Sequence, residues 1–145
     1  MGILSEELQK ISLGRLTSLG FKVTFGGHIG EMNEFESSPI SQRIEDMHAA
    51  FLDKNVKAVL TVIGGFNSNQ LLNYIDFGVI RKNPKIFCGF SDITALQNAI
   101  LKKSSLISYN GRKHSRNQFT IWNFRIIFWI YFAPNFKKVF AQDDL

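Results

Sequence analysis

The sequence predicts an α/β fold in which a mainly parallel sheet of the Rossmann or flavodoxin type is flanked by helices. Segments with helical periodicity alternate along the chain with short apolar segments, as in proteins built from β-α-β units. The run "VKAVLTVI" (Val56–Ile63) is almost continuously apolar and β-branched, which is typical of a strand covered on both faces. The length of 145 residues and a hydrophobic content of 45% fit one globular domain.

The N-terminal elements follow from capping and periodicity. Ser5 is expected to cap a helix that continues to Leu19, with acidic residues in its first turn. Gly20 stands where a left-handed residue ends such a helix. The alternating segment "FKVTF" (Phe21–Phe25) then reads as a strand, ended by two glycines.

The following elements repeat this alternation. Ser41 is expected to cap a second helix, with Met47, Phe51 and Leu52 on its inner face. After the strand Val56–Ile63, the pattern predicts a short helix (Gln70–Tyr74), a strand (Ile86–Phe90), a helix (Ile93–Lys103) and a short strand (Leu106–Tyr109).

Two turns at the carboxyl ends of predicted strands are candidate sites, because α/β sheets bind ligands at that edge. Ser91 follows a strand and precedes a helix, as in a nucleophile elbow, and the amide of Asp92 would face the same site. The pattern also allows Ser91 or Asp92 to be only the helix cap. Gly64 and Gly65 let backbone amides approach a ligand, but a tight turn is the alternative reading.

Charge and cysteine content exclude several classes. The net charge is +5, yet residues 1–111 carry 11 basic and 10 acidic residues, a net of +1, and residues 112–145 carry six and two, a net of +4. A basic excess confined to the tail argues against a nucleic-acid partner. The single cysteine, Cys88, is expected to be buried in a reducing compartment, and the absence of a secretory pattern predicts a cytoplasmic protein. No histidine pair has metal-ligand spacing, so we expect no metal.

The composition changes abruptly after Gly111. Residues 112–145 hold nine of the 19 aromatic residues, and their most apolar part (Ile121–Phe132) is too short to span a membrane. Three explanations compete: a segment that docks on a membrane or partner, a strand pair that closes the domain, and out-of-frame translation, which we favour. We therefore divide the chain into an α/β domain (1–111) and an atypical tail (112–145).

Three motifs together resemble the serine LD-carboxypeptidases, in particular the branch with the microcin C self-immunity peptidases. They are "AAF" (Ala49–Phe51), "GGFNSN" (Gly64–Asn69) and "GFSDITAL" (Gly89–Leu96), within a similarity from about Ser5 to Gly111. The resemblance implies that Ser91 is the nucleophile and that the amides of Asp92, Gly64 and Gly65 form the oxyanion hole.

It further implies that the neighbouring Phe66 and Asn67 contact the substrate, a murein tetrapeptide or a peptidyl-adenylate of the microcin C type. The family cleaves an amide bond next to a free carboxylate and needs no metal or other cofactor.

Two departures from the family's pattern lead us to expect an incomplete, catalytically impaired peptidase. The family has a strand before the first helix, where this sequence has only Met1–Leu4. It also has a second domain that carries the glutamate and histidine of the triad, and the tail resembles nothing in it. The missing strand would leave an open sheet edge, which favours association into a homodimer. The alternative function is a non-catalytic module that binds a small carboxylate or a protein.

Overall fold

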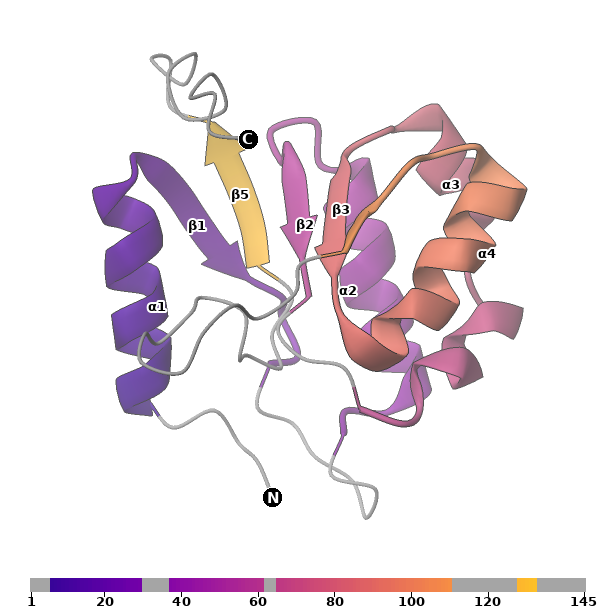
Figure 1. Cartoon of the computed structure of the whole chain (residues 1–145), viewed down its shortest axis with the longest axis horizontal. Helices are drawn as coiled ribbons and strands as arrows, with labels where there is room; N and C mark the ends of the chain where they lie inside the picture. Colours follow the sequence, from indigo (N-terminus) through magenta and orange to yellow (C-terminus); the bar gives the residue numbers. More distant parts are fainter. Residues whose placement is uncertain (1–5, 30–36, 62–64, 111–127, 133–145) are drawn as a thin grey trace.

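The computed structural model describes residues 6–29, 37–61, 65–110 and 128–132 and confirms the α/β class (Figure 1). Along the chain the elements are α1 (Glu6–Ser18), β1 (Phe21–Phe25), α2 (Ile40–Leu52), β2 (Ala58–Leu60), η1 (Ser68–Asn73), α3 (Phe77–Lys82), β3 (Ile86–Gly89), η2 (Ser91–Ile93), α4 (Thr94–Ser104), β4 (Tyr109–Asn110) and β5 (Phe128–Phe132). The cap predicted at Ser5 lies outside the described residues. Gly20 has φ +86, as its predicted role at the end of α1 requires.

The five strands form one sheet in the order β1-β5-β2-β3-β4. β2, β3 and β4 pair in parallel, whereas β5 pairs antiparallel with β1 on one side and with β2 on the other. β1 therefore runs parallel to β2, and β5 is the one strand of this sheet that points the opposite way (Figure 1). The carboxyl ends of β1, β2, β3 and β4 consequently share one edge.

β5 lies inside the sheet, between β1 and β2, where the sequence analysis expected an open edge from a missing strand. In the flavodoxin-type order 2-1-3-4-5, the first strand lies between the second and the third, which correspond to β1 and β2 here. β5 lies in that position, paired over five residues with β1 and over three with β2. Residues 128–132 of the tail thus form one strand of the sheet, whereas the sequence hypothesis was a pair of strands, and the origin of the tail stays a prediction.

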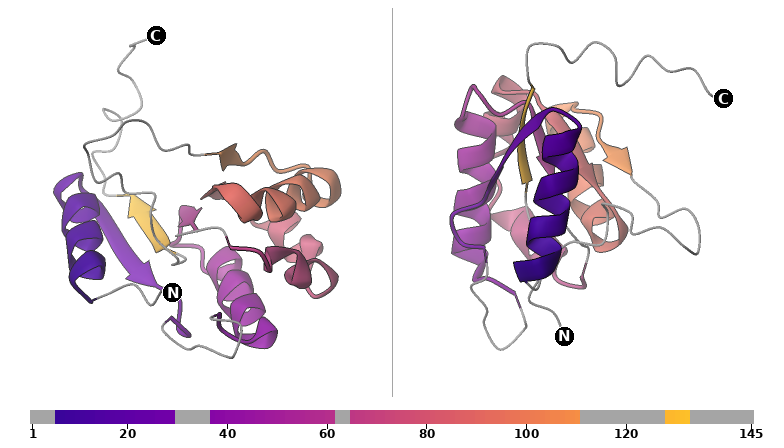
Figure 2. Two further views of the ribbon diagram at one scale, coloured as in Figure 1. Left: turned by 60° about the horizontal axis from the view of Figure 1, so that its bottom comes forward. Right: turned by 90° about the vertical axis from the view of Figure 1, so that its left-hand side faces the viewer.

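Helices cover both faces of the sheet (Figure 2), and two separate clusters of buried side chains form the core on its two faces. One cluster joins α1 through Leu16 to Ala58, Leu60 and the buried, free Cys88. The larger cluster lies on the other face under α2, α3 and α4. Its largest fully buried side chains are Phe51, Phe87, Ile80, Ile100, Val56 and Val59. Alternate residues of β2 thus face opposite cores, which explains its continuously apolar sequence.

The second helix differs from its prediction at both ends. α2 begins at Ile40 with Pro39 as its N-cap, so the expected cap Ser41 is already inside the helix. The carbonyl of Pro39 accepts the amide of Arg43 (3.1 Å), and the proline's fixed φ suits this position. Leu52, the last residue of the helix, was expected on the inner face but is 56% exposed.

Two more differences lie between Tyr74 and Asn110. The sequence prediction missed α3, whose N-cap Asp76 accepts the amides of Gly78 (2.7 Å) and Val79 (3.2 Å). The last strand begins at Tyr109 rather than Leu106. Tyr109 is paired with Cys88, so β4 meets only the final residues of β3.

Candidate active site

Ser91 lies on a sharp turn directly after β3. Phe90 is still extended (φ −150, ψ 160), Ser91 switches to φ 64, and η2 leads from it into α4. Positive φ is uncommon for a residue with a Cβ and costs about 1–3 kcal/mol where the surroundings enforce it. The turn leaves Ser91 exposed at the carboxyl edge of the sheet with the start of a helical segment behind it. This is the geometry of a nucleophile elbow.

The elbow requires a residue without a side chain at position 89. A Cβ on Gly89 would stand 2.4 Å from Cγ2 of Ile93 and 2.6 Å from Oγ1 of Thr61. Its φ is outside the left-handed region, so the requirement is for space rather than for backbone freedom. The close approach of Ile93 to the end of β3 shows how tightly the chain reverses around Ser91.

Neither Ser91 nor Asp92 caps the helix behind the elbow, so the cap interpretation is wrong. In the described part of the chain, no side chain caps the N-terminus of η2 or of α4, whose N-caps are Phe90 and Ile93. Oδ2 of Asp92 instead accepts the amide of Ser68 (2.7 Å), and its carbonyl oxygen accepts the Ser68 hydroxyl (2.7 Å). Ser68 is 5% exposed and opens η1, so these bonds join the segment after β2 to the elbow after β3.

Arg43 holds the same segment from the side of α2. Its guanidinium donates to the backbone oxygen of Asn67 (3.3 Å) and to Oε1 of Gln70 (3.0 Å). The Asn67 side chain accepts a further bond from Arg43 (3.4 Å) and donates to the hydroxyl of Ser37 (2.8 Å). Burial lowers the pKa of Arg43, and the negative charge of Asp92 partly opposes that shift. Sequence reasoning missed Arg43 because its partners lie more than 20 residues away.

The structure describes some of the predicted oxyanion and substrate residues but not all of them. Gly65 is exposed after β2, at the edge that also carries Ser91, while Gly64 lies outside the described residues. Phe66 is 71% exposed next to Gly65. The side chain of Asn67 is engaged in holding the turn, as its bonds to Arg43 and Ser37 show. The oxyanion roles of Gly64, Gly65 and Asp92 therefore stay predictions.

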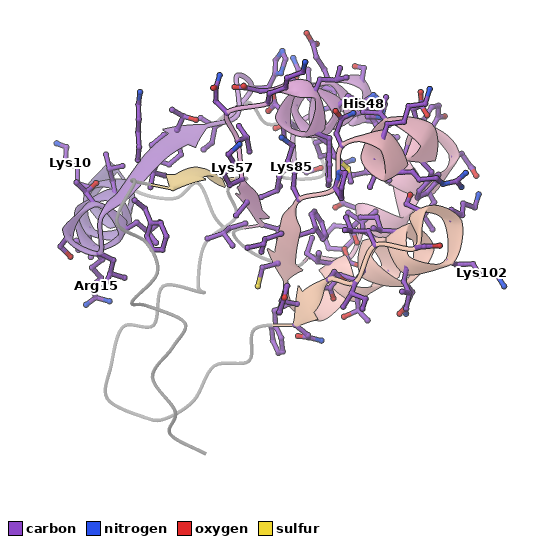
Figure 3. All side chains as sticks on the ribbon, turned by 90° about the horizontal axis from the view of Figure 1, so that it is seen from above. Lys10, Arg15, His48, Lys57, Lys85 and Lys102 are labelled. Atoms are coloured by element: carbon purple, nitrogen blue, oxygen red, sulfur yellow. The ribbon has the colours of Figure 1, made fainter. Side chains whose placement is uncertain are left out.

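The two described histidines, His28 and His48, hydrogen-bond to groups other than Ser91. Nδ1 of His28 lies 3.0 Å from Oδ1 of Asp46, whose carboxylate also accepts the amides of Gly27 and His28. His28 follows β1, and three strand spacings separate β1 from β3, roughly 14 Å at about 4.8 Å each. Nε2 of His48 accepts the amide of Asp76 (2.9 Å) near the start of α3 (Figure 3). His114 lies outside the described residues.

Two features of the described residues bear on other functions. No group of three His, Cys, Asp or Glu side chains among them could hold a metal ion. None of the helices that the structure describes is long and apolar enough to cross a membrane.

Residues 4–111 match the family model described as the LD-carboxypeptidase N-terminal domain. The chain belongs to this family. It is 54% identical over 111 residues to "Putative carboxypeptidase YocD" of Bacillus subtilis, an alignment that covers 77% of this chain and 34% of the relative. Other relatives are named as murein peptide carboxypeptidases and as the microcin C7 self-immunity protein MccF.

Solved structures give the same result for this LD-carboxypeptidase domain. An MccF-like protein from Bacillus anthracis superposes with a TM-score of 0.74 at 56% identity, covering 75% of this chain and 33% of that one. MccF in complex with aspartyl sulfamoyl adenosine superposes with a TM-score of 0.64 at 34% identity, covering 67% and 29%. The chain spans about a third of the length of these relatives from Bacillus subtilis and Bacillus anthracis.

Proposed function

We propose that this chain carries the nucleophile, Ser91, of a serine peptidase of the LD-carboxypeptidase type. The observation that supports this most is the backbone of Ser91: a strained, exposed serine between a parallel strand and a helical segment, in a chain of this family. A serine that only ended a strand would not need φ 64 or the close packing of Ile93 on Gly89.

The proposed reaction is acyl transfer through Ser91. Its Oγ attacks the carbonyl carbon of the amide, and its proton passes to a base. The amides of Asp92 and of the Gly64-Gly65 turn stabilise the negative oxygen of the tetrahedral intermediate. The C–N bond then breaks, the nitrogen takes up a proton and leaves as the amine, and water hydrolyses the ester on Ser91 to the free carboxylate.

We propose that the described part of the chain is catalytically impaired because it brings no base to Ser91. His28 and His48 are bound to other groups, and the strand before His28 stands roughly 14 Å from that before Ser91. The family resemblance implies that a second domain supplies a glutamate and a histidine. Without a complete triad, an oxyanion hole and substrate binding still accelerate the reaction above the uncatalysed rate in water, but the catalytic rate falls by orders of magnitude.

The substrate class is proposed from the relatives. Those named as murein peptide carboxypeptidases point to a murein tetrapeptide that loses its terminal D-residue. The MccF complex with aspartyl sulfamoyl adenosine points to an aminoacyl group joined to a nucleoside. Both have an amide-type carbonyl that Ser91 could attack, and we place the reaction in the cytoplasm, where Cys88 stays reduced.

The test is hydrolysis of both substrates, followed by chromatography and mass spectrometry. The chain is assayed alone and with the remainder of the Bacillus subtilis relative supplied as a second polypeptide. We expect the chain to hydrolyse the substrates slowly by itself and faster with the added polypeptide. The Ser91→Ala variant should show no hydrolysis in either assay. Ser105→Ala is the matched control, because Ser105 is also an exposed serine with positive φ (56) but ends α4. Turnover that persists in Ser91→Ala would contradict the proposal.

The second candidate function is a non-catalytic module that binds a small carboxylate. Arg43 favours it, because the hydrogen bonds of its guanidinium among the described residues go to neutral oxygens of Asn67 and Gln70, and only the charge of Asp92 nearby offsets its own. Thermal stabilisation by acetyl-D-alanine that survives Ser91→Ala and disappears in Arg43→Gln would support this function. Thermal stabilisation by that ligand that requires Ser91 would exclude it.

We propose that residues 112–145 are an addition to the family domain rather than part of it. The family match ends at residue 111, and the tail's basic and aromatic composition begins there. The coding DNA tests the origin directly. If another reading frame after Gly111 encodes the second domain of the family, the tail is a frameshift product; if neither frame does, that origin is excluded.

A further inference from the structure

We infer that the side chain of Asp92 is a positioning residue that fixes the segment after β2 against the Ser91 elbow. The inference rests on the proposed function and adds a role for a carboxylate that neither the family match nor the relatives' names assign. Its motif position, next to Ser91, suggested a helix cap or an amide donor, and the structure shows a different use of the side chain.

The contact consists of two hydrogen bonds between the same two residues, Ser68 and Asp92. The amide of Ser68 donates to Oδ2 of Asp92, and the hydroxyl of Ser68 donates to the backbone oxygen of Asp92, both at 2.7 Å. Two bonds between the same two residues fix orientation as well as distance. Ser68 is 5% exposed, so water competes poorly for these groups, and a bond to a carboxylate is among the stronger hydrogen bonds.

The contact connects the two turns that the reaction needs. Gly65 precedes Ser68 by three residues, and Asp92 follows Ser91 directly. Fixing Ser68 to Asp92 therefore sets where the amide of Gly65 lies relative to the Ser91 hydroxyl. Arg43 constrains the same segment at Asn67, so the segment is held at consecutive residues. Oxyanion donors act only when they are already oriented, and a displacement of about 1 Å can cost about 100-fold in rate.

The test compares Asp92→Ala and Asp92→Asn in the full chain. Asparagine keeps an oxygen that can accept the Ser68 amide, whereas alanine removes it. Asp76→Ala is the control for general destabilisation, because Asp76 also accepts two backbone amides, at the start of α3. A milder variant, Ser68→Ala, removes only the hydroxyl bond and keeps the amide bond.

Two readouts separate this role from a merely structural one. The first is hydrogen exchange of the Ser68 amide, measured by NMR. The second is modification of Ser91 by a fluorophosphonate, with imidazole added as an external base, over a range of probe concentrations. In Asp92→Ala we expect the Ser68 amide to exchange about 10- to 100-fold faster and the maximal modification rate to fall by a similar factor. The probe concentration at half-maximal rate should change less than the maximal rate. Asp92→Asn should restore most of the exchange protection and most of the modification rate, and Ser68→Ala should change both by less than Asp92→Ala does.

Unchanged Ser68 exchange in Asp92→Ala would overturn the inference, as would an equal loss of Ser91 modification in Asp76→Ala. The proposed function fails separately if the unaltered chain is not modified at Ser91. In that case, faster exchange of Ser68 in Asp92→Ala alone, with Asp76→Ala unchanged, still supports the contact, and its absence still overturns it.

Discussion

Replacing Gly89 by alanine tests whether the elbow depends on the close approach of the chain to itself. The new Cβ would stand 2.4 Å from Cγ2 of Ile93 and 2.6 Å from Oγ1 of Thr61. Ile93 is 8% exposed and belongs to the main core, so it has little room to move. Overpacking a buried site costs about 1–3 kcal/mol. Because both contacts are this short, we expect Gly89→Ala to lower the free energy of unfolding by about 3 kcal/mol.

The assay is urea unfolding followed by circular dichroism. The matched control is Gly14→Ala, where a Cβ has nothing within 4 Å and the position lies inside α1. Removing a helical glycine there should stabilise the protein by about 0.5–1 kcal/mol. The two alanines therefore shift the free energy of unfolding in opposite directions. A Gly89→Ala protein as stable as the unaltered chain would refute the account of the elbow.

Three further perturbations test other parts of the fold. Ile130→Pro removes an amide from a strand paired on both sides, so the free energy of unfolding in urea should fall by at least about 1 kcal/mol; no change would show that β5 does not complete the sheet. Gly26→Ala brings a Cβ within 2.5 Å of Oδ2 of Asp46, and the loss of bonds to that carboxylate should cost about 1–3 kcal/mol in the same assay, whereas an unchanged stability would contradict it. Burial lowers the pKa of Lys85 below its usual 10.5, so the folded state loses this proton at a lower pH than the unfolded state does. The free energy of unfolding, compared with that of Lys85→Met, should therefore rise as the pH increases toward 10.5. A decrease of that difference with pH, measured by urea titration, would contradict this account.

The sequence predicted the parts of the fold that depend on local pattern. The buried strand after Lys57 and the strand-to-helix turn at Ser91 are visible as an apolar run and as the Gly-Phe-Ser-Asp motif. Both are present, although β2 covers only Ala58–Leu60. α3 was missed because it is six residues long, too short for a helical period to appear.

Features that depend on distant contacts could not be predicted. Nothing in the composition of the tail indicates that residues 128–132 pair antiparallel between two parallel strands. The bonds between Asp92 and Ser68 join residues 24 apart, and those from Arg43 span 24 to 27 residues. Sequence alone therefore located the strand-to-helix turn at Ser91 but not the residues that hold the segment beside it. His28 also gained its acidic neighbour, Asp46, only through the fold.

The central claim, that Ser91 is a nucleophile on a strained elbow, has a direct measurement. The chain is incubated with a fluorophosphonate and imidazole, digested, and the site of modification is located by tandem mass spectrometry. The account predicts one adduct, on Ser91, absent in Ser91→Ala and retained in Ser105→Ala. Failure of Ser91 to react under conditions that modify the Bacillus subtilis relative, or an adduct on Ser105 instead, would contradict it.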